Sequence, residues 1–177
     1  MQVMEERLPL LILVSGMPAT GKTTFAEWLS SEMRVPLVCY DHIKAKLLES
    51  VKEAGPISYE LFLFICEEIM KSSSPLIAEY LFSKQMEDTL DGLTAKYQYK
   101  TVTVHMDTPV ETAYRRFSDR NSAGIRPSDI SFEKFAAFTK QNKDFRYGEN
   151  FIYVDTADFS KLSYADIAEK ICKARRI

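Results

Sequence analysis

The sequence predicts a single α/β domain over residues 1–177, built on a five-stranded parallel sheet with helices on both faces. Strand-like and helix-like segments alternate along its whole length, as they do in parallel sheets. Leu10–Val14 is apolar without a break, which is typical of a central strand buried on both faces. The chain is long enough for one sizeable hydrophobic core, and no linker divides it.

The first half of the chain supplies three strands and four helices. The helix after the first strand is indicated by Phe25, Trp28 and Leu29, which share one face at helical spacing. Gly55-Pro56 is a turn signal that separates the two helices between the second and third strands. In order, we expect a strand at 10–14, a helix at 23–29, a strand at 35–40, helices at 42–54 and 57–71, a strand at 75–79 and a helix at 82–96.

The second half continues the alternation with two strands and three helices. Thr101–Met106 is rich in β-branched residues, which favour strands. Thr108-Pro109-Val110-Glu111 has the spacing of a capping box, with proline at the first helical position. In order, we expect a strand at 101–106, a helix to about 120, a loop at 121–129, a helix at 131–145, a strand at 151–155 and a helix at 163–175.

One motif carries most of the functional information. Residues 16–23 have the spacing G-x-x-x-x-G-K-[ST] of a phosphate-binding loop, or P-loop, between a strand and a helix. Its glycines let successive backbone N–H groups face one concavity, and the positive end of the helix faces the same anion. Lys22 can bridge the β- and γ-phosphates of ATP, and the Thr23 hydroxyl can ligate Mg²⁺. The expected ATP-binding residues here are Gly16, Met17, Pro18, Ala19, Thr20, Gly21, Lys22, Thr23 and Thr24.

The motif and the order of elements around it resemble the small P-loop kinase superfamily. That superfamily includes adenylate and shikimate kinases, chloramphenicol phosphotransferase and zeta toxins, and the resemblance spans most of the chain. It implies a three-layer P-loop NTPase fold with a short lid at about 116–130. The implied activity is ATP- and Mg²⁺-dependent transfer of the γ-phosphoryl group to a hydroxyl of a small molecule.

The resemblance assigns a catalytic role to Asp41, which directly follows the second expected strand. In zeta-toxin-like and antibiotic-phosphotransferase-like relatives, an aspartate here orients the acceptor hydroxyl or takes its proton. A basic residue three positions later holds substrate, and Lys44 stands where arginine is common. The alternative is that Asp41 only caps the helix that follows.

Glu79 ends the third expected strand, and ligands of open parallel sheets bind at such carboxyl ends. The resemblance implies that Glu79 helps to hold Mg²⁺ through water and contacts the substrate, although many relatives carry aspartate there. The alternative is a structural acid at the start of the next segment.

Three arginines fall in the expected lid. Arg116 and Arg120 lie four residues apart, hence on one face of a helix, and Arg126 follows in a loop. In the lids of nucleotide kinases the first arginine stacks on the base and later ones contact the transferring phosphate. By this resemblance Arg116 binds ATP, while Arg120 and Arg126 are catalytic. The alternative is a solvated helix face.

Aromatic residues accumulate near the expected acceptor side. The segment Leu61–Cys66 is apolar nearly all round its helix, which favours a core position. An acceptor pocket lined by aromatic rings and a homodimer contact are the alternatives. The residues concerned are Tyr59, Phe62, Tyr80 and Phe82.

Composition narrows the partners. A net charge of −2 and a pI near 5.8 make nucleic acid an improbable partner. Three widely spaced cysteines suit a reducing compartment, and the N-terminal segment lacks the basic region of a signal peptide, so we expect a cytoplasmic protein without a membrane segment.

Two alternative functions stay open at this point. A nucleotide or nucleic-acid-end kinase would need more arginines near the acceptor than 41–71 supplies, because that stretch contains none. A non-catalytic nucleotide-binding switch module would have no need of an acceptor base such as Asp41.

Overall fold

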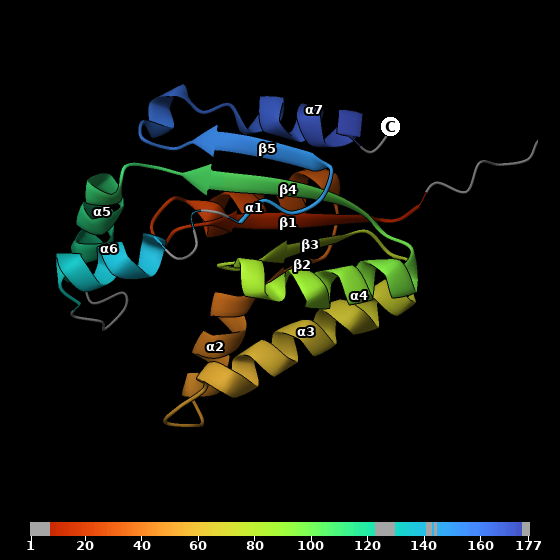
Figure 1. Ribbon diagram of the computed structural model, residues 1–177, viewed down its shortest axis with the longest axis horizontal. Coiled ribbons are helices and arrows are strands. Elements are labelled where there is room, and N and C mark those ends of the chain that lie inside the picture. The colour runs from red at the N-terminus through yellow and green to blue at the C-terminus, as the bar shows by residue number, and fades with distance from the viewer. Residues whose placement is uncertain (1–7, 123–129, 141–142, 144, 175–177) are drawn as a thin grey trace, which may run out of the picture.

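Five parallel strands form one sheet in the order β2-β3-β1-β4-β5 in the computed structural model (Figure 1), which describes residues 8–122, 130–140, 143 and 145–174. This arrangement confirms the predicted five-stranded parallel sheet of a P-loop NTPase-like fold. The strands are β1 (Leu10–Gly16), β2 (Leu37–Cys39), β3 (Leu76–Glu79), β4 (Lys100–Asp107) and β5 (Asn150–Asp155).

Helices cover both faces of the sheet and give the molecule three layers (Figure 1). One face is covered by α1 (Lys22–Met33) and α7 (Tyr164–Ala174), and the other by α3 (Gly55–Lys71) and α4 (Glu87–Tyr97). The short α2 (Tyr40–Leu48) packs beside α3. At the carboxyl end of β4, α5 (Val110–Ser122) packs against α6 (Phe132–Lys140).

The unbroken apolar run of β1 is explained by its central position. Ile12 and Val14 pack in the core beneath α1 and α7, whereas Leu11 and Leu13 pack in the core beneath α3 and α4. Alternate side chains of a strand point to opposite faces, so a strand covered on both sides needs apolar residues throughout. This burial fixes the carboxyl end of β1, where the P-loop begins.

Several predicted boundaries were wrong by a few residues. The second strand stops at Cys39, and Tyr40 already belongs to α2, which ends at Leu48. Gly55-Pro56 does not precede α3 but opens it, because proline is tolerated in the first helical turn. The helix expected at 82–96 begins at Glu87, after a 3₁₀ turn, η1 (Lys84–Met86).

The predicted capping box at 108–111 does not form. The backbone of α5 closes as expected, since the N–H of Ala113 donates to the carbonyl of Pro109 at 3.0 Å. The Thr108 hydroxyl, however, is buried without a hydrogen-bond partner among the described residues. The helix begins at Val110, so Pro109 precedes it and does not occupy the predicted first helical position, and the reciprocal side-chain cap does not form there.

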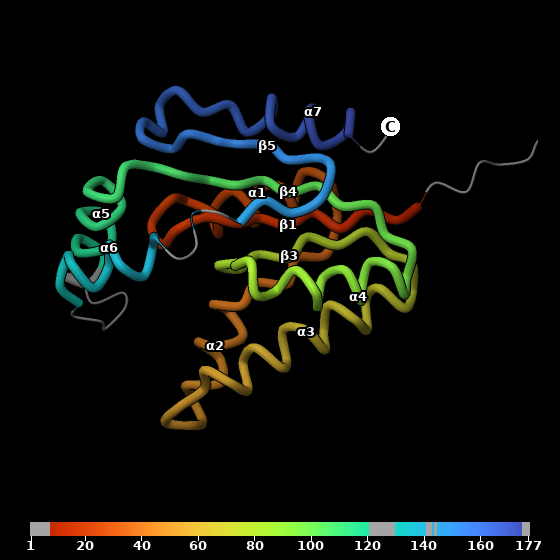
Figure 2. Tube along the Cα trace, in the orientation of Figure 1, coloured from red at the N-terminus to blue at the C-terminus, as the bar shows by residue number. Residues whose placement is uncertain are grey.

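Residues 145–149 run back along the α3/α4 side of the sheet to the start of β5 (Figure 2). The helix predicted at 131–145 is thus shorter, because Phe145 and Tyr147 leave helical geometry to fill the core between sheet and α4. The hydroxyl of Thr103 on β4 fixes this segment by donating to the carbonyl of Tyr147 at 2.7 Å.

Helices in the described part of the chain all fall short of the length and apolar character needed to cross a membrane.

Candidate active site

The P-loop connects β1 to α1 at the carboxyl edge of the sheet, and its glycines are required by the geometry. Gly16 has φ of 137°, and a Cβ there would lie 2.0 Å from the carbonyl oxygen of Met106 on the neighbouring β4. Gly21 has φ of 87° at the residue before α1. Both positions exclude an ordinary side chain, so the backbone can pass close to a bound phosphate.

The loop keeps its shape through its own polar contacts. The carbonyl of Met17 accepts hydrogen bonds from the Thr20 hydroxyl and from the ammonium of Lys22, both at 2.9 Å. The N-cap of α1 is Gly21, which has no side chain that could cap the helix. The first N–H groups of α1 are therefore directed to the space above the loop, where the helix dipole favours an anion.

Glu79 lies beside Lys22 and Thr23, as the sequence predicted for a group at the carboxyl end of β3. Its carboxylate is 3% exposed, with Oε1 3.8 Å from the Nζ of Lys22. Its Oε2 accepts a hydrogen bond from the Thr23 hydroxyl at 3.4 Å. A buried carboxylate is tolerated here because a cation and hydroxyl compensate its charge.

The residues present fit a magnesium ion. A threonine hydroxyl and a carboxylate are hard oxygen donors of the kind Mg²⁺ prefers, and Thr23 and Glu79 bring them together. No cluster of three or more His, Cys, Asp or Glu side chains at metal-binding spacing occurs in the described part of the chain. Mg²⁺ usually takes one or two protein ligands and completes its shell with water and phosphate oxygens.

Asp41 lies in the first turn of α2, directly after β2. Glu79 ends β3, the strand that pairs with β2. The N-cap of this helix is Cys39, so Asp41 is not the capping residue that the alternative interpretation required. Burial raises the pKa values of Tyr40 and Tyr80, and the negative charge of Asp41 raises both further. Lys44 follows one turn later on α2, and both Asp41 and Lys44 are half-buried.

The four aromatic residues singled out in the sequence divide into two groups. Phe62 and Phe82 are each 1% exposed and belong to the core beneath α3 and α4. Tyr59 and Tyr80 are half-buried, with ring centroids 5.9 Å apart, and the ring of Tyr40 lies 4.5 Å from that of Tyr80 at an interplanar angle of 59°. Three tyrosine rings thus form a partly open wall beside Asp41.

Arg116 is held by residues that follow β5. Its guanidinium donates to the carbonyls of Thr156 and Ala157, each at 2.9 Å, and its Cζ lies 4.1 Å from the ring centroid of Phe159. Phe159 in turn packs against Gly21, where an added Cβ would meet its ring at 2.9 Å. Arg116 therefore ties α5 to the segment lying over the P-loop.

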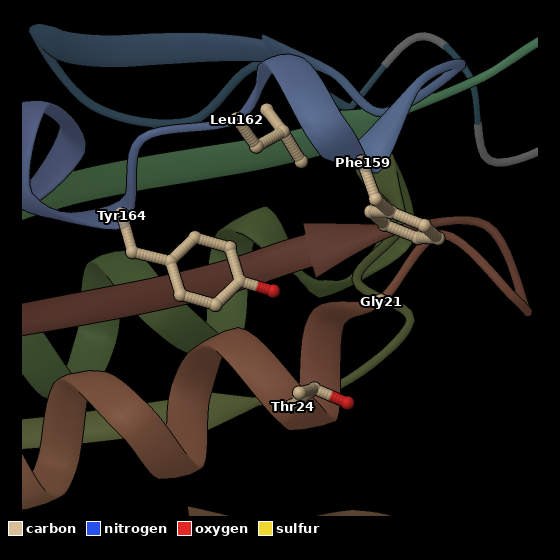
Figure 3. A pocket seen from close by; sticks show the side chains of 5 residues that line it. All are labelled: Gly21, Thr24, Phe159, Leu162 and Tyr164. Carbon is tan, nitrogen blue, oxygen red and sulfur yellow. The ribbon is translucent and has the colours of Figure 1, made fainter.

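A pocket of about 460 Å³ opens between this segment and the start of α1 (Figure 3). In Figure 3, Phe159 and Leu162 lie on one side and Thr24 on the other, while Tyr164 directs its hydroxyl between them. The pocket adjoins Gly21 and has two aromatic walls, which suits a flat heterocyclic base next to the phosphate loop. The residues lining it are Gly21, Thr24, Phe159, Leu162 and Tyr164.

Sequence reasoning missed Phe159, Leu162 and Tyr164, and no motif could have indicated them. They reach the P-loop only because β5 lies beside β4, which returns the chain over the start of α1. Of the other predicted lid arginines, Arg120 has an exposed side chain near the end of α5, and Arg126 lies outside the described residues.

Solved structures with the same fold include several small kinases. A kinase candidate from Chloroflexus aurantiacus superposes with a TM-score of 0.86 at 20% identity, over 94% of this chain and 98% of that one. A gluconokinase from Sinorhizobium meliloti gives 0.60 at 16% identity, over 97% and 94% of the two chains. The APS kinase of Mycobacterium tuberculosis, solved with AMPPNP and APS, gives 0.62 at 13% identity, over 96% and 98%. These likenesses confirm the predicted resemblance to small P-loop kinases in fold.

A search of curated proteins finds no match to the sequence. The model of the AAA_33 family, an AAA domain, matches residues 11–144. This range contains all of β1 except Leu10, β2 to β4, the P-loop, Asp41, Glu79 and Arg116, so it includes most of the site described above. The chain therefore belongs to the AAA_33 family of P-loop AAA domains, which implies that it binds a nucleotide.

Proposed function

We propose that this protein is an ATP- and Mg²⁺-dependent phosphotransferase whose acceptor is a hydroxyl of a small molecule. The observation that carries the proposal is the contact of Lys22 and Thr23 with Glu79 at the head of α1, with Asp41 in the first turn of α2, the helix that follows the neighbouring strand β2. The first three suit a metal-bound triphosphate, and a carboxylate at the same edge of the sheet suits a hydroxyl acceptor. The similarity in fold to gluconokinase and APS kinase supports the same function.

The nucleotide has a natural place in this site. The P-loop amides hold the α- and β-phosphates, and Lys22 leaves the Met17 carbonyl to bridge the β- and γ-phosphates. The adenine lies in the pocket of Phe159, Leu162 and Tyr164. Arg116 then acts on the base through Phe159, which it stacks on, rather than as the bare stacking partner that the resemblance implied.

Transfer follows from the position of Asp41. Its carboxylate takes the proton of the acceptor hydroxyl as that oxygen forms a bond to the γ-phosphorus. The bond from the γ-phosphorus to the β,γ-bridging oxygen breaks, its electron pair leaves with ADP, and Asp41 later returns the proton to water. Bound Mg²⁺ would neutralise charge on the β- and γ-phosphate oxygens and would be held by Thr23, with Glu79 ordering its shell.

The remaining predicted residues complete the proposal. Residues 116–130 form the lid of a single domain, in which Arg120 and Arg126 stabilise charge on the transferring group and exclude water. Lys44 and the tyrosine wall bind the acceptor.

A screen of metabolites and antibiotics for hydroxyl-dependent ATP consumption, with mass detection of the added phosphate, tests the proposed phosphotransferase activity. Tight ATP binding with no acceptor in the screen would instead favour a switch module.

Glu79→Gln is expected to raise the Mg²⁺ concentration needed for half-maximal activity by about tenfold, a scale known for groups that support a metal site. The reason is that glutamine keeps the shape but not the charge facing the metal. The KM for ATP at saturating Mg²⁺ should change less. Glu27→Gln is the matched control, because its carboxylate contacts His42 at the surface at 3.3 Å. An unchanged Mg²⁺ titration would leave Glu79 as a structural residue.

Arg116→Ala is expected to raise the KM for ATP by about tenfold and to change kcat by less than about threefold. It removes two hydrogen bonds and the stacking that hold Phe159 over Gly21, so the base pocket loses one wall. Arg116→Lys should raise the KM for ATP almost as much, since lysine lacks the planar, forked guanidinium group. Arg115→Ala, which removes an exposed neighbour on α5, is the control. Equal effects at both positions would contradict this role.

A further inference from the structure

Cys39 and Glu79 are register partners at the carboxyl ends of two neighbouring parallel strands. Each is the last residue of its strand, β2 or β3, and the two pair directly in the ladder. One residue earlier, Val38 and Ala78 both pack beneath α3, so Cys39 and Glu79 face the side of α1. Both are 3% exposed, and the Sγ of Cys39 donates a hydrogen bond to the Oε2 of Glu79 at 2.8 Å.

The Cys39 thiol lies nearer to the Glu79 carboxylate than the side chains of Thr23 and Lys22 do. The Thr23 hydroxyl donates to the same Oε2 at 3.4 Å, and the Lys22 ammonium lies 3.8 Å from Oε1. Lys22 and Thr23 belong to the phosphate and metal site, so both change partners when MgATP binds. Cys39 lies in β2, outside the P-loop, and its side chain is buried, so it can keep its contact with Glu79 when MgATP binds.

The thiol is the donor in this contact. Its Sγ lies 2.8 Å from the Oε2 of Glu79, and a carboxylate oxygen can only accept a hydrogen bond. A donor held permanently against a carboxylate limits the orientations that the carboxylate can adopt.

We propose that Cys39 is a positioning residue, whose thiol holds the Glu79 carboxylate toward Thr23 and the magnesium site and keeps it from closing onto Lys22. Without this contact Glu79 is free to turn its charge to Lys22, and it then competes with the ATP phosphates for the same ammonium. This inference rests on the proposed function, in which Glu79 orders the metal's shell.

The test measures metal binding without turnover. Mn²⁺ is titrated into the protein saturated with the non-hydrolysable ATP analogue AMPPNP, and free Mn²⁺ is followed by electron paramagnetic resonance. Cys39→Ala is expected to weaken Mn²⁺ binding by about tenfold, as is typical when an outer-shell partner is removed. Cys39→Ser keeps a hydrogen-bond donor at this position, and it should bind Mn²⁺ within about twofold of the unmutated protein.

Cys66→Ala is the matched control. Cys66 is also a buried cysteine, 5% exposed, but it packs on α3 in the core. Its loss should lower thermal stability as much as Cys39→Ala does and leave Mn²⁺ binding unchanged. Unaltered Mn²⁺ binding in Cys39→Ala, or equal weakening in the alanine and serine variants, would overturn the positioning role. If the unmutated protein binds AMPPNP but no Mn²⁺, the proposed role of Glu79 at the metal is wrong, and the positioning role of Cys39 is wrong as a consequence.

A second measurement follows the hydrogen bond of the Cys39 thiol directly. The S–H stretching band of Cys39 in the infrared spectrum is identified as the band lost in Cys39→Ser. Glu79→Gln should move that band to higher frequency, because a neutral acceptor forms a weaker hydrogen bond than a carboxylate. The bands of Cys66 and Cys172 should stay in place. A Cys39 band that does not move would show that the thiol makes no functional hydrogen bond to Glu79.

Discussion

Lys22→Ala is expected to lower kcat/KM for ATP by at least about 100-fold, equivalent to about 2.7 kcal/mol of transition-state stabilisation. The side chain is the cation nearest the buried Glu79 carboxylate among the contacts described above, and it sits at the head of α1, where the P-loop is proposed to hold the phosphates. Alanine removes the charge proposed to bridge the β- and γ-phosphates. Steady-state kinetics of phosphate transfer, with ATP binding followed by calorimetry, measures the effect.

Two further variants keep this result interpretable. Lys22→Met retains most of the stem, so it separates loss of charge from loss of packing around the loop. Lys46→Ala removes an exposed lysine of α2 that pairs with Glu49, and it should leave activity unchanged. Circular dichroism should show a folded protein in each case. Normal ATP affinity and turnover in both Lys22 variants would rule out the nucleotide site.

Asp41→Asn is expected to reduce phosphorylation of an identified acceptor by roughly 10²–10⁴-fold, the usual weight of general acid–base catalysis. Asparagine keeps the size of the side chain but removes the negative charge and the capacity to accept a proton. Binding of ATP should persist, because Lys22 and the loop amides are untouched. The comparison of kcat for transfer with the dissociation constant of ATP separates these two effects.

Asp88→Asn is the control for the structural contribution of such a residue. Asp88, like Asp41, is an acid in the first turn of a helix, but it lies on the surface of α4. Each change should cost only a few tenths to about 1 kcal/mol of stability, the scale of a charge near a helix N-terminus. Normal acceptor phosphorylation in Asp41→Asn would make the residue structural and place the base elsewhere.

Local patterns were sufficient for the parts of the molecule that depend on neighbours in sequence. The P-loop is contiguous, so its glycines, Lys22 and Thr23 could be assigned directly from their spacing. The strands could be recognised because burial on both faces demands apolar residues in succession, as at Leu10–Val14. Glu79 could be placed at the site because it ends a parallel strand, and all such ends meet at one edge. The exact ends of helices were less predictable, since Tyr40 and Phe145 follow packing rather than intrinsic propensity.

Only the tertiary structure decided which side chains meet across the sheet and over the loop. The contact of Cys39 with Glu79 depends on strand register, which no local pattern in β2 or β3 encodes. Arg116 finds its partners forty residues later, because β5 returns the chain beside α5. Burial likewise separated Phe62, which fills the core, from Tyr59, which stays partly open, although both lie on α3. Sequence determines the chemistry available at each position, whereas long-range packing determines which of those groups come within bonding distance.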